Sequence, residues 1–213
     1  QLKLNIEQNA IDSLNEALSK YREGNNGNLK AFKFTILHLS HCIELTLKLY
    51  LQTLNKNLIF SLCYKEVKRV SEREKISLLE AFNKLEAECF DFEGSIEGQI
   101  KPHTVTVDQA VKIAQCETCK ITGTVFVDDN FISDIQWMKS LRNSIEHYEF
   151  EFTAQEIRLC IGRLVRGLSE FIDIFSLFNL KEKINPEEYK TFSTLADEYE
   201  QTLSELAIDI KDA

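Results

Sequence analysis

Three polar residues in one short segment carry the clearest potential for chemistry in this chain. Arg142, Asn143 and His147 lie within Leu141–His147. Histidine titrates near neutral pH, so it can act as a general acid or base when a ribose 2′-hydroxyl attacks the adjacent phosphodiester. Arginine stays charged and can hold two phosphate oxygens while negative charge builds up in the transition state. Asn143 can orient the His147 ring or bind a ribose, so these residue types suit cleavage of RNA.

Helical geometry separates these residues around the helix that carries them, which is predicted to begin at about Asn130. Successive residues advance by about 100° around a helix axis. The predicted apolar stripe consists of Ile135, Met138, Leu141, Ile145, Tyr148 and Phe152. Asn143 and His147, four positions apart, share the side opposite Ile145 and are predicted to be exposed. Arg142 lies nearer the edge of the stripe, where a neighbouring helix should pack.

The motif resembles the signature of the HEPN superfamily (higher eukaryotes and prokaryotes nucleotide-binding domains). In that superfamily an Arg, followed by Asn, Asp or His, precedes a His by a few residues. The resemblance implies an up-and-down helical bundle and a metal-independent endoribonuclease without a cofactor. It also implies catalytic roles for Arg142 and His147, a supporting role for Asn143, and a homodimer in which two copies of the motif meet. Many members bind without cutting, so a noncatalytic nucleotide-binding, RNA-binding or protein-assembly module is the alternative.

One branch of the superfamily consists of toxins paired with nucleotidyltransferase antitoxins. Its members carry a Tyr two residues after the His, where it is modified with AMP. Here Tyr148 follows His147 directly and Glu149 occupies the expected place. The resemblance to the superfamily still implies a toxin or antiphage function, with RNA as substrate and an antitoxin as a partner to be considered. It argues against regulation through that tyrosine.

A second polar group lies on one side of the apolar helix predicted for residues 29–54. Its residues, at spacings of three and four, are His38, His41, Glu44, Lys48 and Gln52. Glu44 and Lys48 are placed to form a favourable i,i+4 pair. We expect a polar seam within the bundle, in which Glu44 positions Arg142. A metal-dependent helical enzyme that uses His38, His41 and Glu44 is a weaker alternative, because no further ligand stands at a convincing spacing.

Two further groups of residues have the types and spacing of binding sites. Arg163 and Arg166 on the helix predicted for 153–178 could extend a phosphate-binding surface, or pair with the acidic end of the chain.

Cys116 and Cys119 have zinc-ligand spacing but lack a second pair. Cys89 and His103 are the only nearby candidates to complete such a site, so we predict no metal. The stretch 65–75 mixes both signs of charge and is expected to be a solvated face.

Composition predicts the architecture that positions these residues. The chain has 213 residues, 44% of them hydrophobic, with only 7 Gly and 2 Pro, which favours long helices joined by few loops. Amphipathic patterns predict helices at about 6–21, 29–54, 76–89, 108–113, 130–152, 153–178 and 187–210. Asp108 is predicted to cap one helix and Thr153, with Glu156, another. We expect an all-α HEPN-type bundle over 1–182, with a small extended element within 103–127, and an acidic C-terminal helical extension over 183–213.

Charge and hydropathy narrow the functional classes. Of the net charge of −9, the segment from Pro186 carries −6, because eight acids there oppose Lys190 and Lys211. The rest of the chain carries −3. This balance argues against broad, nonspecific DNA binding, and it favours a motif that acts where two copies meet. No apolar run is long enough to cross a bilayer and no signal-peptide pattern is present, so we expect a cytoplasmic protein that does not contact membranes.

Overall fold

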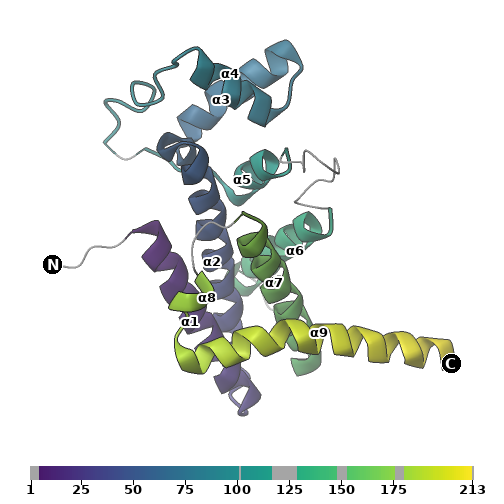
Figure 1. Cartoon of the computed structure of the whole chain (residues 1–213). Helices are drawn as coiled ribbons and strands as arrows, with labels where there is room; N and C mark the ends of the chain where they lie inside the picture. Colours follow the sequence, from purple (N-terminus) through teal and green to yellow (C-terminus); the bar gives the residue numbers. More distant parts are fainter. Residues whose placement is uncertain (1–4, 101, 117–128, 148–152, 176–179, 213) are drawn as a thin grey trace. The chain divides into compact units, whose positions relative to one another are not determined.

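The computed structural model describes residues 5–100, 102–116, 129–147, 153–175 and 180–212. Within these ranges it gives no description of the side chains at 129–131, 146–147, 180, 196, 200 and 202–212. The regular elements of the described residues are all helical, which confirms the all-α prediction (Figure 1). They are α1 (Ile6–Asn25), α2 (Ala31–Leu54), the 3₁₀ helix η1 (Lys56–Ile59), α3 (Ser61–Glu74), α4 (Leu78–Ala87), α5 (Val107–Ala114), α6 (Asp129–His147), α7 (Ala154–Phe175), α8 (Leu180–Lys183) and α9 (Pro186–Asp212).

The chain folds into two compact units. The first consists of residues 1–45 and 133–213, and the second of residues 46–132, so the helix α2 begins in one and ends in the other. Helix α9, which makes up most of the predicted extension, contacts α7 and α1 within the first unit (Figure 1). The division of the chain at residue 182 remains a prediction.

The core of the first unit is built from the apolar faces of its helices. The predicted stripe of α6 is confirmed at its four described positions, Ile135, Met138, Leu141 and Ile145, each at most 5% exposed. Tyr148 and Phe152, also assigned to that stripe, lie outside the described residues. Leu14 of α1 and Ile36 of α2 are fully buried in the same unit. Burial of these residues fixes the rotation of α6 about its axis, and therefore the direction in which its polar residues face.

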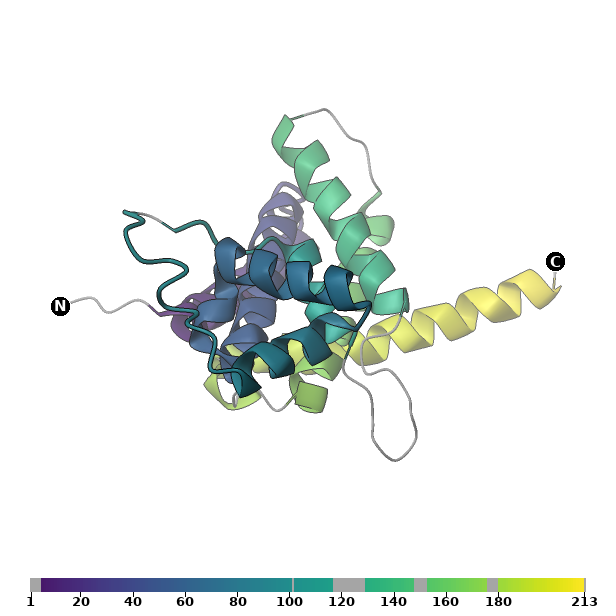
Figure 2. The same cartoon turned by 90° about the horizontal axis from the view of Figure 1, so that it is seen from above.

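The second unit contains the end of α2 and a group of shorter helices. Helix α3 packs against η1 and α4, which lies beside it in Figure 2, and α4 contacts α5. The extended piece predicted at 103–107 is reduced to a single antiparallel bridge between Phe60 and Thr104, because α5 begins at Val107. Two backbone hydrogen bonds of 2.8 Å flank this bridge, from Ser61 N to His103 O and from Val105 N to Ile59 O. The other predicted extended piece, 121–127, lies outside the described residues.

Helix caps were predicted correctly in one case and wrongly in another. Thr153 and Glu156 form the expected capping box at the start of α7, with hydrogen bonds of 2.7 and 3.2 Å between the backbone nitrogen of each and the side chain of the other. The cap of α5 is Thr106, not Asp108 as predicted. Thr106 Oγ1 accepts a hydrogen bond from the backbone nitrogen of Gln109. In turn, the backbone nitrogen of Thr106 donates to Gln109 Oε1. Asp108 lies two residues after Thr106, in the first turn of α5, where its charge interacts favourably with the helix dipole.

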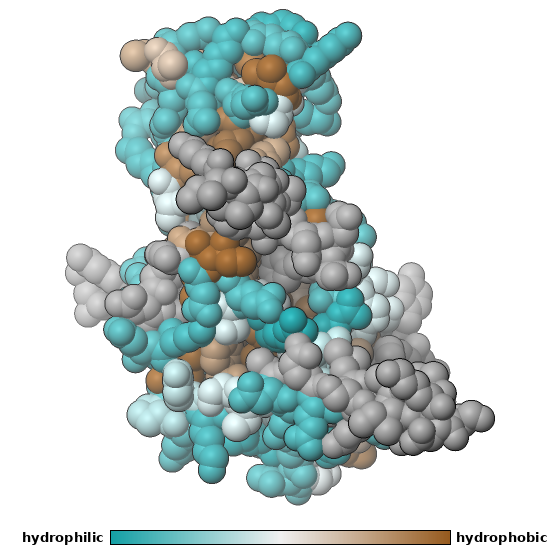
Figure 3. Space-filling view, turned by 45° about the vertical axis from the view of Figure 1, so that its right-hand side comes forward, coloured by the Kyte–Doolittle hydropathy of each residue, from teal (hydrophilic) through white to brown (hydrophobic). Residues whose placement is uncertain are grey.

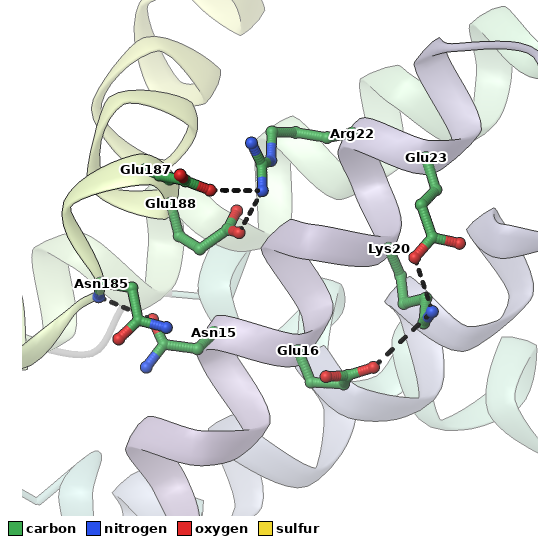
Figure 4. A network of polar contacts seen from close by, with 8 residues as sticks. All are labelled: Asn15, Glu16, Lys20, Arg22, Glu23, Asn185, Glu187 and Glu188. Carbon is green, nitrogen blue, oxygen red and sulfur yellow. Dashed lines mark hydrogen bonds and ion pairs between the residues drawn. The ribbon is translucent and has the colours of Figure 1, made fainter.

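The N-terminal end of α9 is attached to α1 by polar contacts between residues far apart in the sequence (Figure 4). Arg22 Nη2 lies 2.6 Å from Glu188 Oε1 and 3.5 Å from Glu187 Oε2. The backbone nitrogen of Asn185 donates to Asn15 Oδ1 at 2.9 Å. Glu188 is only 5% exposed, so this attachment includes a buried carboxylate. We refer to these five residues as the α1–α9 clamp.

Candidate functional site

The site centres on two neighbouring residues of α6 that lie on different sides of the helix. Leu141 and Ile145 are buried, and the residues between them turn outward. Asn143 is exposed, as predicted, whereas the side chain of Arg142 is 37% exposed at the edge of the buried stripe. His147 is the last residue of α6, and its side chain lies outside the described part of the structure.

Arg142 is paired with Glu44 of α2, as the sequence predicted. Arg142 Nη1 lies 3.8 Å from Glu44 Oε2, and the Glu44 side chain is 25% exposed. This separation is longer than a hydrogen bond between these two atoms, so the contact is an ion pair of charges that solvent still reaches. The pair joins two helices of the first unit and holds the guanidinium at the edge of the buried stripe.

The remaining polar residues of α2 are held by other contacts. His41 Nδ1 and Ser13 Oγ share a hydrogen bond of 2.9 Å, which links α2 to α1. Burial lowers the pKa of His38, although the charge of Glu16 acts to raise it. The net lowering favours a neutral imidazole ring. Lys48 Nζ donates to Thr104 Oγ1 at 3.2 Å within the second unit. The α2 residues therefore form structural polar contacts along the helix, and Glu44 reaches Arg142.

The two arginines proposed for phosphate binding are both engaged in ion pairs on or beside α7. Arg163 forms a close ion pair with Asp134 of α6, and Arg166 Nε lies 3.2 Å from Glu170 Oε1. Burial acts to lower the pKa of Arg163, but the hydrogen bond and charge of Asp134 raise it overall. Phosphate would have to compete with these carboxylates, so a phosphate-binding role for either arginine stays a prediction.

The ion pair between Asp134 and Arg163 was not predicted from the sequence. Asp134 is 8% exposed and stands directly before buried Ile135. A carboxylate at a buried position requires a partner, because an unpaired buried charge is costly. That rule applied to the stripe of α6 would have pointed to a cation on the next helix, which is Arg163.

The positions of the potential metal ligands and of the cysteines bear on a metal site and on a cysteine nucleophile. Among the residues that the structure describes, no three His, Cys, Asp or Glu side chains are grouped to hold a metal ion. Cys116 Sγ donates to Lys112 O at 3.3 Å, and Cys119 lies outside the described residues. Burial raises the pKa of Cys160 to about 11, so its thiol is protonated at neutral pH and is a poor nucleophile.

The charged stretch on α3 is a mixed surface. Lys68 lies 3.3 Å from Glu72, and Arg69 lies 2.8 Å from Glu66. Hydrophilic residues dominate this part of the molecule in Figure 3, at the top. Acids in the same helix offset the basic residues here, so α3 does not offer the concentrated positive surface that binds a nucleic-acid backbone.

Comparisons of the chain with family models, curated proteins and solved structures find no match. None of the described helices combines the length and apolar character needed to cross a membrane. Function is therefore inferred from the residues and contacts described above.

Proposed function

We propose that this protein is a metal-independent endoribonuclease of the HEPN type that acts as a homodimer. The observation that carries the proposal is the Arg142–Glu44 ion pair, which holds a partly exposed arginine at the edge of α6, next in sequence to exposed Asn143. An arginine held in this way can bind an anion at the protein surface without being buried in the core. The spacing of Arg142, Asn143 and His147 that resembles the HEPN signature supports the same assignment.

In this proposal the three motif residues divide the reaction between them. His147 removes the proton from a ribose 2′-hydroxyl, whose oxygen then attacks the adjacent phosphorus. Arg142 binds the phosphate oxygens and stabilises the charge that develops on them, while Asn143 orients the histidine or the ribose. The bond from phosphorus to the 5′-oxygen breaks, and that oxygen takes up a proton. The products are a 2′,3′-cyclic phosphate and a free 5′-hydroxyl.

A second copy of the chain would improve this site electrostatically. The chain is acidic overall, and Glu44 offsets part of the charge of Arg142. Two motifs that meet across a dimer would place two arginines near one phosphate, which favours anion binding. The resemblance also supports a cytoplasmic toxin or antiphage role, in which an antitoxin would be the partner.

Cleavage of RNA in the presence of EDTA tests the proposal against its alternatives. We expect the purified protein to cut single-stranded RNA in excess chelator and to leave cyclic phosphate ends, because no step above requires a metal ion. Cleavage that appears only after a divalent metal is added would contradict the proposal and favour a metal-dependent enzyme. Binding of diverse RNAs by the folded dimer without any cleavage would favour the noncatalytic module.

Replacement of Glu44 by Gln is expected to lower cleavage roughly threefold to tenfold without loss of fold, because Arg142 loses the charge that positions it. Glu16→Gln is the matched control, since Glu16 also forms an ion pair of 3.8 Å, with Lys20 of the same helix. Initial cleavage rates should be measured beside far-UV circular dichroism for both variants. Equal rates for Glu44→Gln and wild type would remove Glu44 from the site.

A further inference from the structure

A pocket in the first unit is not used by the proposed ribonuclease reaction. It has a volume of about 150 Å³ and lies where α9 crosses α1 and α7 (Figure 1). Its apolar wall is formed by Tyr21, Leu159, Leu195 and Tyr199. A cavity of about this size holds one aromatic ring, so only part of a fused two-ring base would enter it. Polar residues at its rim are exposed, so part of a larger ligand can project into solvent.

Gly162 makes the close approach of α7 and α9 possible at the base of this pocket. A Cβ atom at this position would lie 3.2 Å from Tyr199 Cβ and 3.3 Å from Leu195 O. Such contacts are tighter than ordinary packing, so a Cβ here would require Tyr199 or the α9 backbone to shift by a few tenths of an ångström. The glycine therefore keeps Tyr199 and Leu195 close to α7, and its amide is a well-placed reporter of binding.

The polar rim combines a positive and a negative group. Arg158 is fixed by a 2.7 Å hydrogen bond from its Nε to Asn25 Oδ1, and its guanidinium lies 5.8 Å from the centre of the Phe32 ring. Glu198 lines the pocket from α9. Burial is the main cause that raises the pKa of Tyr21, yet the charges of Glu198 and Arg158 also act on it, in opposite directions. Both charged groups therefore lie near the phenol.

We propose that this pocket binds a guanine base. Guanine presents two neighbouring donors, N2–H and N1–H, on its Watson–Crick edge, and two acceptors, O6 and N7, on the adjacent Hoogsteen edge. A carboxylate such as that of Glu198 accepts from the donors, and a fixed guanidinium such as that of Arg158 donates to the acceptors. The half-buried ring of Tyr199 offers a face for stacking. Adenine lacks N1–H and carries an amine in place of O6, so it matches this pair of charges poorly.

Guanine could come from a free nucleotide or from a strand of RNA, and one titration series separates these sources. The amide resonance of Gly162 is followed in ¹⁵N-labelled protein during addition of guanosine or adenosine 5′-monophosphate. Short 2′-deoxy strands with one central guanine or adenine form the second pair of ligands. These strands have no 2′-hydroxyl, so the proposed ribonuclease reaction cannot affect the result. Tighter binding of the guanine strand than of the mononucleotide would identify a strand as the source, and the reverse order a free nucleotide.

We expect saturable shifts with the guanine ligands and affinity at least about tenfold higher than for adenine. Glu198→Gln should remove most of this preference, because the amide loses the negative charge and replaces one of the two acceptor oxygens with a donor. Asp197→Asn, a change of the same charge at the preceding exposed position of α9, should keep it. Both positions are exposed, so both variants should fold, which circular dichroism checks. Absence of saturable shifts, equal affinity for the two bases, or identical behaviour of the two variants would overturn the proposal.

Discussion

Replacement of Arg142 by alanine is expected to lower RNA cleavage by about a hundredfold or more, the size of effect seen when one group that stabilises transition-state charge is removed. The change also removes the ion pair with Glu44, but the side chain is 37% exposed, so the fold should remain. Arg142→Lys should recover only part of the activity, because lysine keeps the charge but lacks the planar fork that holds two oxygens. Initial rates in EDTA, measured with each variant, check the prediction.

Lys139→Ala is the matched control for this experiment. Lys139 is an exposed cation on α6, one turn before Arg142, so its removal changes the net charge of the helix by the same amount. A loss of activity in Lys139→Ala as large as that in Arg142→Ala would show that general charge, not a specific site, supports cleavage.

His147→Ala should also lower the cleavage rate by about a hundredfold or more, as expected for removal of a general acid or base. Full activity in either motif variant would contradict the proposed reaction.

The sequence was sufficient to predict the helical fold and the orientation of the motif helix. Scarce glycine and proline, together with apolar residues at helical spacing, predict long helices and identify the buried side of α6. Once Leu141 and Ile145 are buried, the 100° step places Asn143 outward and Arg142 at the edge. Arg142 and Glu44 both stand at the border of an apolar face, which is compatible with the pair that forms, but periodicity alone does not select one partner helix over another.

Contacts between distant segments could not be predicted in the same way. Periodicity shows which side of a helix is buried but does not name the helix that covers it. The clamp residues Arg22 and Glu188 are 166 positions apart, and each taken alone looks like an ordinary surface charge. The prediction of Asp108 as the cap of α5 was wrong for a local reason, since Thr106 and Asp108 are both good capping residues. Gln109, three positions after Thr106, completes the capping box and decides between them.

The α1–α9 clamp should make a large contribution to stability that depends on the charges of Arg22 and Glu188. Arg22→Met leaves the carboxylate of Glu188, 5% exposed, without its closest cation. We expect the free energy of unfolding to fall by about 2 kcal/mol, because removing one partner of a buried pair leaves an uncompensated charge. This value lies below that of a fully buried pair, since the Arg22 side chain is 41% exposed and solvent screens it. Urea unfolding followed by circular dichroism measures the change.

Lys20→Met is the control, because Lys20 lies on the same helix and its ion pairs with Glu16 and Glu23 are more exposed. It should cost under about 1 kcal/mol. The double change of Arg22→Met and Glu188→Leu should recover most of the loss. Arg22 Nε and Glu188 Oε2 are buried and make no hydrogen bond within the described part of the chain, so the native pair is itself incompletely satisfied. If the double variant is no more stable than Arg22→Met alone, an uncompensated Glu188 charge is not the cause, and the clamp stabilises α9 through packing instead.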